Sequence, residues 1–217
     1  MTQFESFRDA VSRLTDGGVS MGHELSEVVA KVTAALTPHE MQLTGEQAWL
    51  DASMRQVFVG NQSIVMLRYG SDVVVRPAPA TGFVMLQFVL AGSIKVEHDG
   101  YVTYGEAGQG LIIESLDKRV LHWSKDCEQL ILPLPRSMIS QAIETLTGRP
   151  PPVRFDFDRV VDLATPEAEP LLTLVQYILS IAVSAKKNDR PPRIVRRSGF
   201  LVLLISMLRS STTARRQ

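Results

Sequence analysis

The middle of the chain, from about residue 42 to residue 134, is a series of short runs rich in β-branched and aromatic residues. Glycine, Asp-Gly and other turn residues separate the runs, as expected for short strands that follow one another. About eight or nine strands at this spacing favour a β-barrel or a two-sheet jelly roll over alternating strand–helix units. In chain order the runs are MRQVFVG, SIVMLRYG, DVVVR, FVMLQFVLAG, IKVEH, YVTYG, GLIIES, VLHWS and QLILPL.

The stretch LAGSIKVEHDGYVTYGEAGQGLII, residues 90–113, indicates how two of these strands are joined. Its Asp99-Gly100 pair is the preferred sequence of a two-residue hairpin turn, because both positions can take a positive φ. We therefore expect a hairpin centred on this pair. The run FVMLQFVL just before it is apolar at successive positions. This pattern predicts a strand with one face inside the barrel and the other under helices.

Helical patterns lie on both sides of the strands. Residues 3–14 and about 22–36 carry apolar residues at three- and four-residue spacing, and Pro38 ends the second segment. After the strands, Pro135 and Gly148 are placed to begin and end another helix.

Two further helices are predicted toward the C-terminus. Thr165 is expected to cap one of them, with Pro166 at its first position. The other covers about 192–210 and contains the longest apolar run, GFLVLLISML. A membrane span needs about twenty apolar residues, so we expect no membrane partner. The N-terminus lacks the apolar core of a signal peptide, and Cys127 is the single cysteine, which together predict a cytoplasmic protein.

The formal net charge is zero, but the charge is unevenly distributed. Residues 186–217 contain nine basic residues and one acid, a net +8, so residues 1–185 carry −8. A solvated basic helix face accounts for this segment, and so does a basic tail that leads toward a nucleic-acid-binding part. Both interpretations stay open at this point.

A metal-binding cupin pattern is only partly present. The pattern has a glycine, a histidine after five residues, a second histidine two positions later and then a glutamate. Gly92 and His98 have the first spacing, but Gly100 occupies the second histidine position and Glu106 lies one place beyond the usual window. A catalytic metal generally needs three protein ligands. We therefore predict no metal, no cofactor and no catalytic residue, with a cupin-type metal-dependent isomerase or dioxygenase as the alternative.

From about Met54 to Ile139, the segments SIVMLRYGSDVVVRP, FVMLQFVLAGSIKVEHDG, GEAGQGLIIES and LILPLPRSMI follow one another, and RFDFDRVVDLATPEAEPLLTLVQYIL comes after them. This order resembles the N-terminal, AraC-binding-like sensor domain of AraC/XylS-type transcriptional regulators. The resemblance implies a cupin-like barrel without metal, a pocket for a small-molecule effector and a homodimer formed by helices after the barrel. It also implies a C-terminal DNA-binding part with two helix-turn-helix units.

The sequence departs from that family at its C-terminus, because nothing in 190–217 reads as two helix-turn-helix units. Promoter DNA is therefore expected as a partner only through a domain that this chain does not contain. We expect an isolated sensor domain of a transcription activator rather than a naturally short protein. The predicted fold is α+β: a cupin-like β-barrel or jelly roll with N-terminal helices and a C-terminal helical hairpin. The predicted parts are a helical segment at 1–41, the barrel at 42–147, and a linker with dimerisation helices at 148–217.

Five residues of the predicted strands are candidates for contact with the effector. A methionine adapts its shape to a ligand, an arginine fork suits a carboxylate, and a glutamine in an apolar strand is a polar group that a pocket can use. A histidine next to a tryptophan adds one more, since adjacent strand residues point to opposite faces. The candidates are Met66, Arg68, Gln87, His122 and Trp123. Solvent exposure of the polar residues and burial of the tryptophan in the core are the alternative explanations.

The helix that follows Thr165 carries an apolar stripe formed by Leu171, Leu174, Ile178 and Ile181. We predict that this stripe forms the dimer interface, and its burial in the core of the same chain explains it equally well. A structural or interaction domain whose barrel is filled by its own side chains remains a further alternative to an effector sensor.

Overall fold

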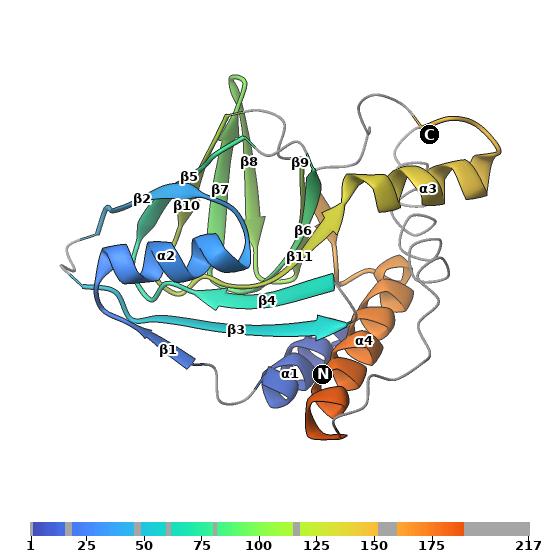
Figure 1. Cartoon of the computed structure of the whole chain (residues 1–217), viewed down its shortest axis with the longest axis horizontal. Coiled ribbons are helices and arrows are strands. Elements are labelled where there is room, and N and C mark those ends of the chain that lie inside the picture. The colour runs from blue at the N-terminus through green and yellow to red at the C-terminus, as the bar shows by residue number, and fades with distance from the viewer. Residues whose placement is uncertain are drawn as a thin grey trace.

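The computed structural model describes residues 2–15, 19–45, 49–59, 62–79, 82–114, 118–151 and 160–188. Within them it has four α-helices and one short 3-10 turn around two antiparallel sheets (Figure 1). The helices are α1 (Gln3–Thr15), α2 (Leu25–Ala35), α3 (Arg136–Thr147) and α4 (Glu169–Asn188), and the 3-10 turn is η1 (Pro166–Ala168).

The strands form one sheet of seven and one of five within the described residues. In spatial order the larger sheet contains β1 (Val19–Gly22), β3 (Ala52–Val59), β4 (Gln62–Arg68), β11 (Glu128–Pro135), β6 (Phe83–Ala91), β9 (Gln109–Glu114) and β12 (Val160–Asp162). The smaller contains β2 (His39–Leu43), β5 (Val73–Pro77), β10 (Arg119–Trp123), β7 (Ser93–His98) and β8 (Tyr101–Glu106). The two sheets form a cupin-like jelly roll, which confirms the predicted α+β fold class.

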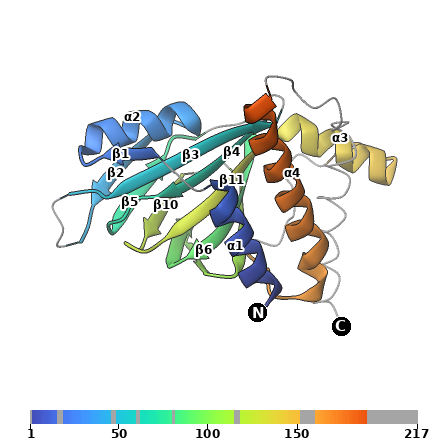
Figure 2. The same ribbon diagram turned by 90° about the horizontal axis from the view of Figure 1, so that it is seen from below.

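Strand β6 is buried on both faces, as its sequence predicted. Leu86 and Phe88 point outward into the apolar cluster that also contains side chains of α1 and α4, and Phe7 of α1 lies 5.8 Å from Phe88 between ring centroids. Met85 and Val89 point inward into a second cluster that fills the space between the sheets. Figure 2 shows α1 and α4 packed against one face of the larger sheet. The alternation of β6 therefore separates a helix-side core from an interior core.

Helix α2 lies at the edge of the interior core rather than over the outer face. Its Val28 and Val32 are buried among the interior side chains. The helix begins at Leu25, later than predicted, because Val19–Gly22 pairs with β3 as strand β1. A four-residue strand is too short for its period to be visible in the sequence. Strand β2 then runs through residue 41, so no structural break marks the predicted boundary between 1–41 and 42–147.

The hairpin between β7 and β8 confirms the prediction from Asp-Gly. His98 pairs with Tyr101, and Asp99 and Gly100 between them have φ values of 47° and 77°. Both lie in the left-handed region that this two-residue turn requires.

The helices after the strands agree with the sequence in part. Helix α3 ends at Gly148, whose left-handed backbone lets its N–H donate to the Glu144 carbonyl at 2.8 Å. Thr165 is an N-cap residue followed by Pro166 at the first position, as predicted, but the element that they begin is η1, which precedes α4. The Thr165 hydroxyl makes no capping bond and donates to the Asp162 carbonyl at 3.1 Å. The predicted helix at 192–210, the second arm of the hairpin, lies outside the described residues. None of the described helices is both long and apolar enough to cross a membrane.

Replacing Gly92 by alanine tests the corner between β6 and β7. The added Cβ would lie 2.5 Å from the backbone nitrogen of Cys127, at a φ of 62°. We expect the free energy of unfolding in urea to fall by about 2–4 kcal/mol, because a left-handed backbone and a backbone clash act together. Gly100→Ala is the matched control: φ is 77° and nothing lies within 4 Å, so a loss of about 1 kcal/mol is expected. Equal losses in the two variants would contradict the role of the close contact at Gly92.

Candidate functional site

A cavity of about 60 Å³ lies between the two sheets. Strands β4, β6, β9 and β11 form one wall, β5 and β10 form the other, and α2 and the start of β2 contribute to the rim. Its apolar lining includes Val32, Leu36, Leu67, Val75, Met85, Ile113, Leu121 and Ile131. These residues are inward-facing members of their strands, or lie on the inner side of α2, so the same alternation that builds the interior core also shapes the cavity.

Three polar atoms of cavity-lining residues are buried without a hydrogen-bond partner among the described residues. They are Nε2 of His39, Oε1 of Gln87 and Nε1 of Trp123. Gln87 and Trp123 are only 5% and 4% exposed. Leaving one such group unsatisfied costs about 1–3 kcal/mol, so buried polar groups are normally bonded to protein, water or a ligand. An apolar cavity with a few polar groups of this kind is the usual composition of a small-molecule site.

His39 presents a hydrogen-bond acceptor. Its Nδ1 lies 3.0 Å from the carbonyl oxygen of Thr37 and 3.4 Å from the hydroxyl of Thr33. A carbonyl only accepts, so Nδ1 carries the proton and donates, and in the neutral ring Nε2 is left with a lone pair. Burial lowers the pKa of His39, although the bond to the Thr37 carbonyl acts in the opposite direction. The neutral ring is therefore the form near pH 7.

Trp123 is held by an aromatic neighbour and by its strand. Its ring meets Tyr69 edge-on, with the centroids 5.0 Å apart, and both rings are buried. Burial also raises the pKa of the Tyr69 hydroxyl. Trp123 pairs with Ile94 on one side and Val73 on the other, which fixes its side chain toward the interior. A rigid aromatic pair of this kind offers a flat, well-ordered wall to a ligand.

Two of the five candidate contact residues line this cavity, namely Gln87 and Trp123. The other three lie elsewhere. Met66 packs against the helix-side cluster because it alternates with the inward-facing Leu67. His122 alternates with Trp123 and lies on the outer side of β10, with its Nε2 3.2 Å from Glu97. Effector contact through Met66 or His122 would thus require a site other than this cavity.

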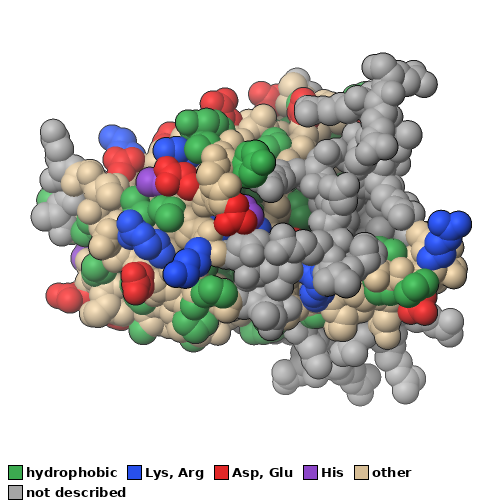
Figure 3. Space-filling view, turned by 90° about the horizontal axis from the view of Figure 1, so that it is seen from above, with side chains coloured by type: hydrophobic (Ala, Val, Ile, Leu, Met, Phe, Trp, Pro, Cys, Tyr) green, Lys and Arg blue, Asp and Glu red, His purple; other side chains and the backbone are tan. Residues whose placement is uncertain are grey.

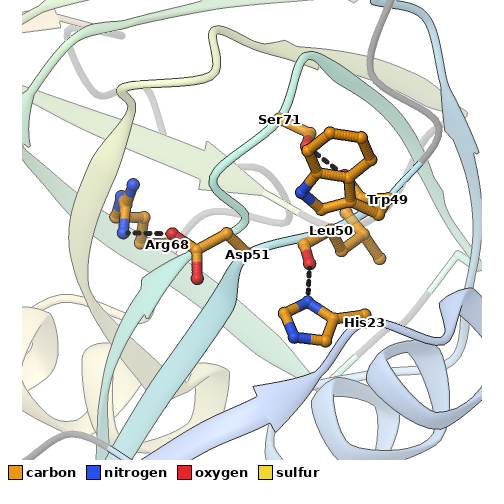
Figure 4. A network of polar contacts seen from close by, with 6 residues as sticks. All are labelled: His23, Trp49, Leu50, Asp51, Arg68 and Ser71. Atoms are coloured by element: carbon orange, nitrogen blue, oxygen red, sulfur yellow. Dashed lines mark hydrogen bonds and ion pairs between the residues drawn. The ribbon is translucent and has the colours of Figure 1, made fainter.

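Arg68 lies at the end of β4 in a separate, open hollow of about 410 Å³ at the surface. Its Nη1 is 3.4 Å from Asp51 Oδ2, and both side chains are largely exposed, so the pair contributes little to stability. Figure 4 shows this contact beside two bonds that fix the backbone at 49–50: Ser71 donates to the Trp49 carbonyl at 2.8 Å, and His23 to the Leu50 carbonyl at 2.5 Å. The hollow has a more polar lining than the cavity, and the two share no lining residue.

Sequence reasoning missed His39, Tyr69 and Arg119, which also line the cavity. The sequence predicts a helical segment at 1–41, which includes His39, whereas this residue begins strand β2 directly after Pro38. The alternation in HEMQL, where Met41 is buried between exposed neighbours, is the signal that could have identified the strand. Register then places His39 opposite Pro77, on the strand next to β10.

Within the described part of the chain, the other nucleophilic and metal-ligating side chains are not gathered into one site. Burial raises the pKa of the Cys127 thiol to about 12, so it is not a nucleophile at neutral pH. His98 lies at the hairpin end with its Nε2 3.3 Å from Asp99. Among the described residues, no three His, Cys, Asp or Glu side chains are close enough together to hold a metal ion. On the face shown in Figure 3, acidic and basic side chains are interspersed rather than gathered into one patch of a single sign.

The stripe on α4 is divided between the core and the surface. Leu171 and Ile178 are buried in the helix-side cluster, and Leu174 is half-buried against it. Ile181 is also half-buried. Tyr177 lies between these two in the helical repeat and is 56% exposed. An apolar and aromatic edge formed by Leu174, Tyr177 and Ile181 is therefore accessible on this helix, and we call it the α4 edge.

Comparisons with known proteins point to one family. The sequence pattern of the AraC-binding-like domain matches residues 28–209. Among solved structures, the AraC-like transcriptional activator CuxR is similar with a TM-score of 0.58 and 14% sequence identity, covering 82% of this chain. This chain spans 63% of the length of that one. At this identity the likeness to CuxR shows the fold.

More distant likenesses involve smaller parts of the chain. A putative ethanolamine utilization protein from Salmonella typhimurium has a TM-score of 0.35 and 12% identity, over 39% of this chain and 70% of that one. KdgF from a Halomonas species has a TM-score of 0.35 and 13% identity, over 44% and 86%. Both scores are too low to inform the fold. Among curated proteins, none matches this sequence significantly.

The buried state of His39 predicts a pH dependence of stability. Its folded pKa lies below the ordinary 6.5, so the unfolded chain binds more protons as the pH falls below about 6.5. The free energy of unfolding should therefore decrease between pH 7 and pH 5. In His39→Phe, the part of that decrease due to this ring should be absent. Urea unfolding of both proteins across this range measures the difference, and identical slopes would mean that His39 is not held neutral by burial.

Proposed function

Because this chain belongs to the AraC-binding-like domain family, we propose that it is the effector-sensing and dimerisation domain of a transcription activator. A small organic molecule binds in the cavity between the sheets and controls how the regulator binds promoter DNA. A helix-turn-helix domain outside this chain makes the contacts with DNA. The chain itself has no catalytic role in this proposal.

The observation that carries the proposal is the cavity with three polar atoms that have no hydrogen-bond partner among the residues that the structure describes. A barrel that served only as a structural module would fill its interior with apolar side chains and would gain nothing from burying His39, Gln87 and Trp123 in this way. A ligand that bonds to these atoms recovers the free energy that their burial costs. The site is thus organised for binding.

The position of the cavity also supports a sensing role. Val32, Leu36 and His39 come from the segment of α2 and β2, whereas Gln87 and Trp123 come from the two sheets. A ligand that contacts both parts stabilises the arrangement in which they are closed on each other. Only such a difference in affinity between two arrangements can shift the state of a regulator.

Strand β6 links the ligand to the helices. Gln87 faces the cavity, and its neighbours Leu86 and Phe88 face the cluster shared with α1 and α4. A small shift of this strand on ligand binding is therefore passed to the packing of α4. The α4 edge then meets the same surface of a second copy, and the dimer carries the change toward the DNA-binding part.

A filled cavity should abolish effector binding. We expect at least one compound in a panel of small organic acids, alcohols, phenols and amides to raise the melting temperature of the chain. At a concentration of about 100 times Kd the gain is about 2.7 kcal/mol, or roughly 5–10 °C for a domain of this size. Val75→Phe places a ring in the cavity and should remove the shift. Arg76→Phe, on the outer side of the same strand, should retain it. No stabilisation by any compound, or an equal shift in Val75→Phe, would contradict the proposal.

The dimer is tested on the α4 edge. Tyr177→Glu should convert the dimer to a monomer in light scattering, because it places a charge in the centre of the interface while the side chain is exposed in the single chain. Ser137→Glu on α3 introduces the same charge at another exposed helical position and should leave the dimer intact. A Tyr177→Glu protein that stays dimeric would rule out the α4 edge as the dimer interface.

A further inference from the structure

We propose that the ligand of the cavity is a small neutral molecule with two hydroxyl groups on a short carbon frame, and not a carboxylate. This inference rests on the proposed function, since it names the chemical class that the effector cavity accepts. It follows from the hydrogen-bonding character of three buried atoms, from the size of the cavity and from the way the two sheets share the polar groups.

The hydrogen-bonding character favours a molecule that both donates and accepts. Nε2 of His39 is an acceptor, because Nδ1 keeps the proton that it donates to the Thr37 carbonyl. Nε1 of Trp123 can only donate. Oε1 of Gln87 is an acceptor, and its amide can turn to offer N–H instead. A carboxylate only accepts, so it would satisfy Trp123 but meet the lone pair of His39 with another lone pair. A hydroxyl group both donates and accepts, so hydroxyls can pair with each of these three kinds of atom.

The size of the cavity limits the carbon frame. Its volume of about 60 Å³ is well below the roughly 150 Å³ of an engineered apolar cavity that holds benzene. The volume exceeds the roughly 10–15 Å³ that a cavity needs to hold one water molecule. The space is therefore suited to a short-chain diol, whose carbon atoms contact Val75, Leu121 and Ile131 while its hydroxyls reach the polar atoms.

The polar groups lie on both sheets. His39 and Trp123 belong to strands of the smaller sheet, and Gln87 belongs to β6 of the larger one. A molecule with two hydroxyls can therefore bond to both sheets at once, whereas a single hydroxyl would leave one side unsatisfied. Arg119 also lines the cavity, but this residue has an interaction of its own within the chain, so we do not count it among the groups that need a ligand.

The indole N–H of Trp123 offers a direct readout. The chain has two tryptophans, and the exposed Trp49 lies outside the cavity. Butane-2,3-diol and butanoate are matched in size, because they have equal numbers of carbon and of oxygen atoms. Each is titrated separately into the ¹⁵N-labelled 217-residue chain at pH 7.5. Trp49→Phe assigns the two indole cross-peaks. We expect the diol to shift the Trp123 peak saturably, with no change at Trp49, and butanoate to bind at least about tenfold more weakly.

Two variants identify the atoms that are responsible. Gln87→Leu and His39→Phe each remove one acceptor, and each should weaken diol binding about tenfold while leaving the weak binding of butanoate unchanged. Their melting curves establish that they fold, and either variant alone suffices if the other does not. Diol affinity that is unchanged in both variants would overturn the inference.

The same titration separates the inference from the function on which it rests. Butanoate binding at the Trp123 peak as tightly as the diol would overturn the neutral-diol class while supporting an effector cavity. A Trp123 peak that neither compound moves would also overturn the class, for example because ordered water satisfies the three atoms. The compound panel with Val75→Phe then decides whether the cavity binds any effector.

Discussion

The burial of strand β6 on both faces is the constraint on which the rest of the structure depends. A strand with Leu86 and Phe88 on one side and Met85 and Val89 on the other cannot leave either face in water. The outward face is covered by α1 and α4, and the inward face is covered by the second sheet (Figures 1 and 2). The central neighbours β9 and β11 are buried in the same manner. Two separate cores follow, and the cavity lies in the one that side chains of both sheets share.

How much of this could be predicted differs from feature to feature. The strand series and the Asp99-Gly100 hairpin were predictable, because turn residues and apolar runs act locally. The sequence placed Gln87 on one of the two faces of its strand but did not show which, because an apolar run does not distinguish the inner face from the outer one. Met66 was a candidate for ligand contact but faces the helix-side cluster, and its sequence pattern likewise did not show which face is inside. His39 could not be placed in the site from the sequence, because its proximity to Trp123 depends on the order β2-β5-β10, which is a long-range pairing.

The family match and the geometry complement each other. The match over residues 28–209 identifies the kind of domain, and the likeness to CuxR agrees with the jelly roll and its accompanying helices. Neither indicates what the cavity accepts. The ligand class that we propose rests on three atoms without a hydrogen-bond partner in the described part of the chain, and on the Thr37 carbonyl that fixes the proton on His39. The carbonyl of Thr37, a residue that itself lines the cavity, thus sets which nitrogen of His39 is the acceptor.

The alternation along β6 has a consequence for how proteins of this design can diverge. Positions 85, 87 and 89 face the interior core that contains the cavity, and positions 86, 88 and 90 face the helix-side cluster. A substitution at an odd position therefore alters the interior core and its cavity, whereas one at an even position alters the packing of the helices. In the function proposed above, effector recognition and dimer assembly are thus encoded on a single strand in two interleaved sets of residues. On that proposal, changes in one set can alter the effector while the other set preserves the helix packing.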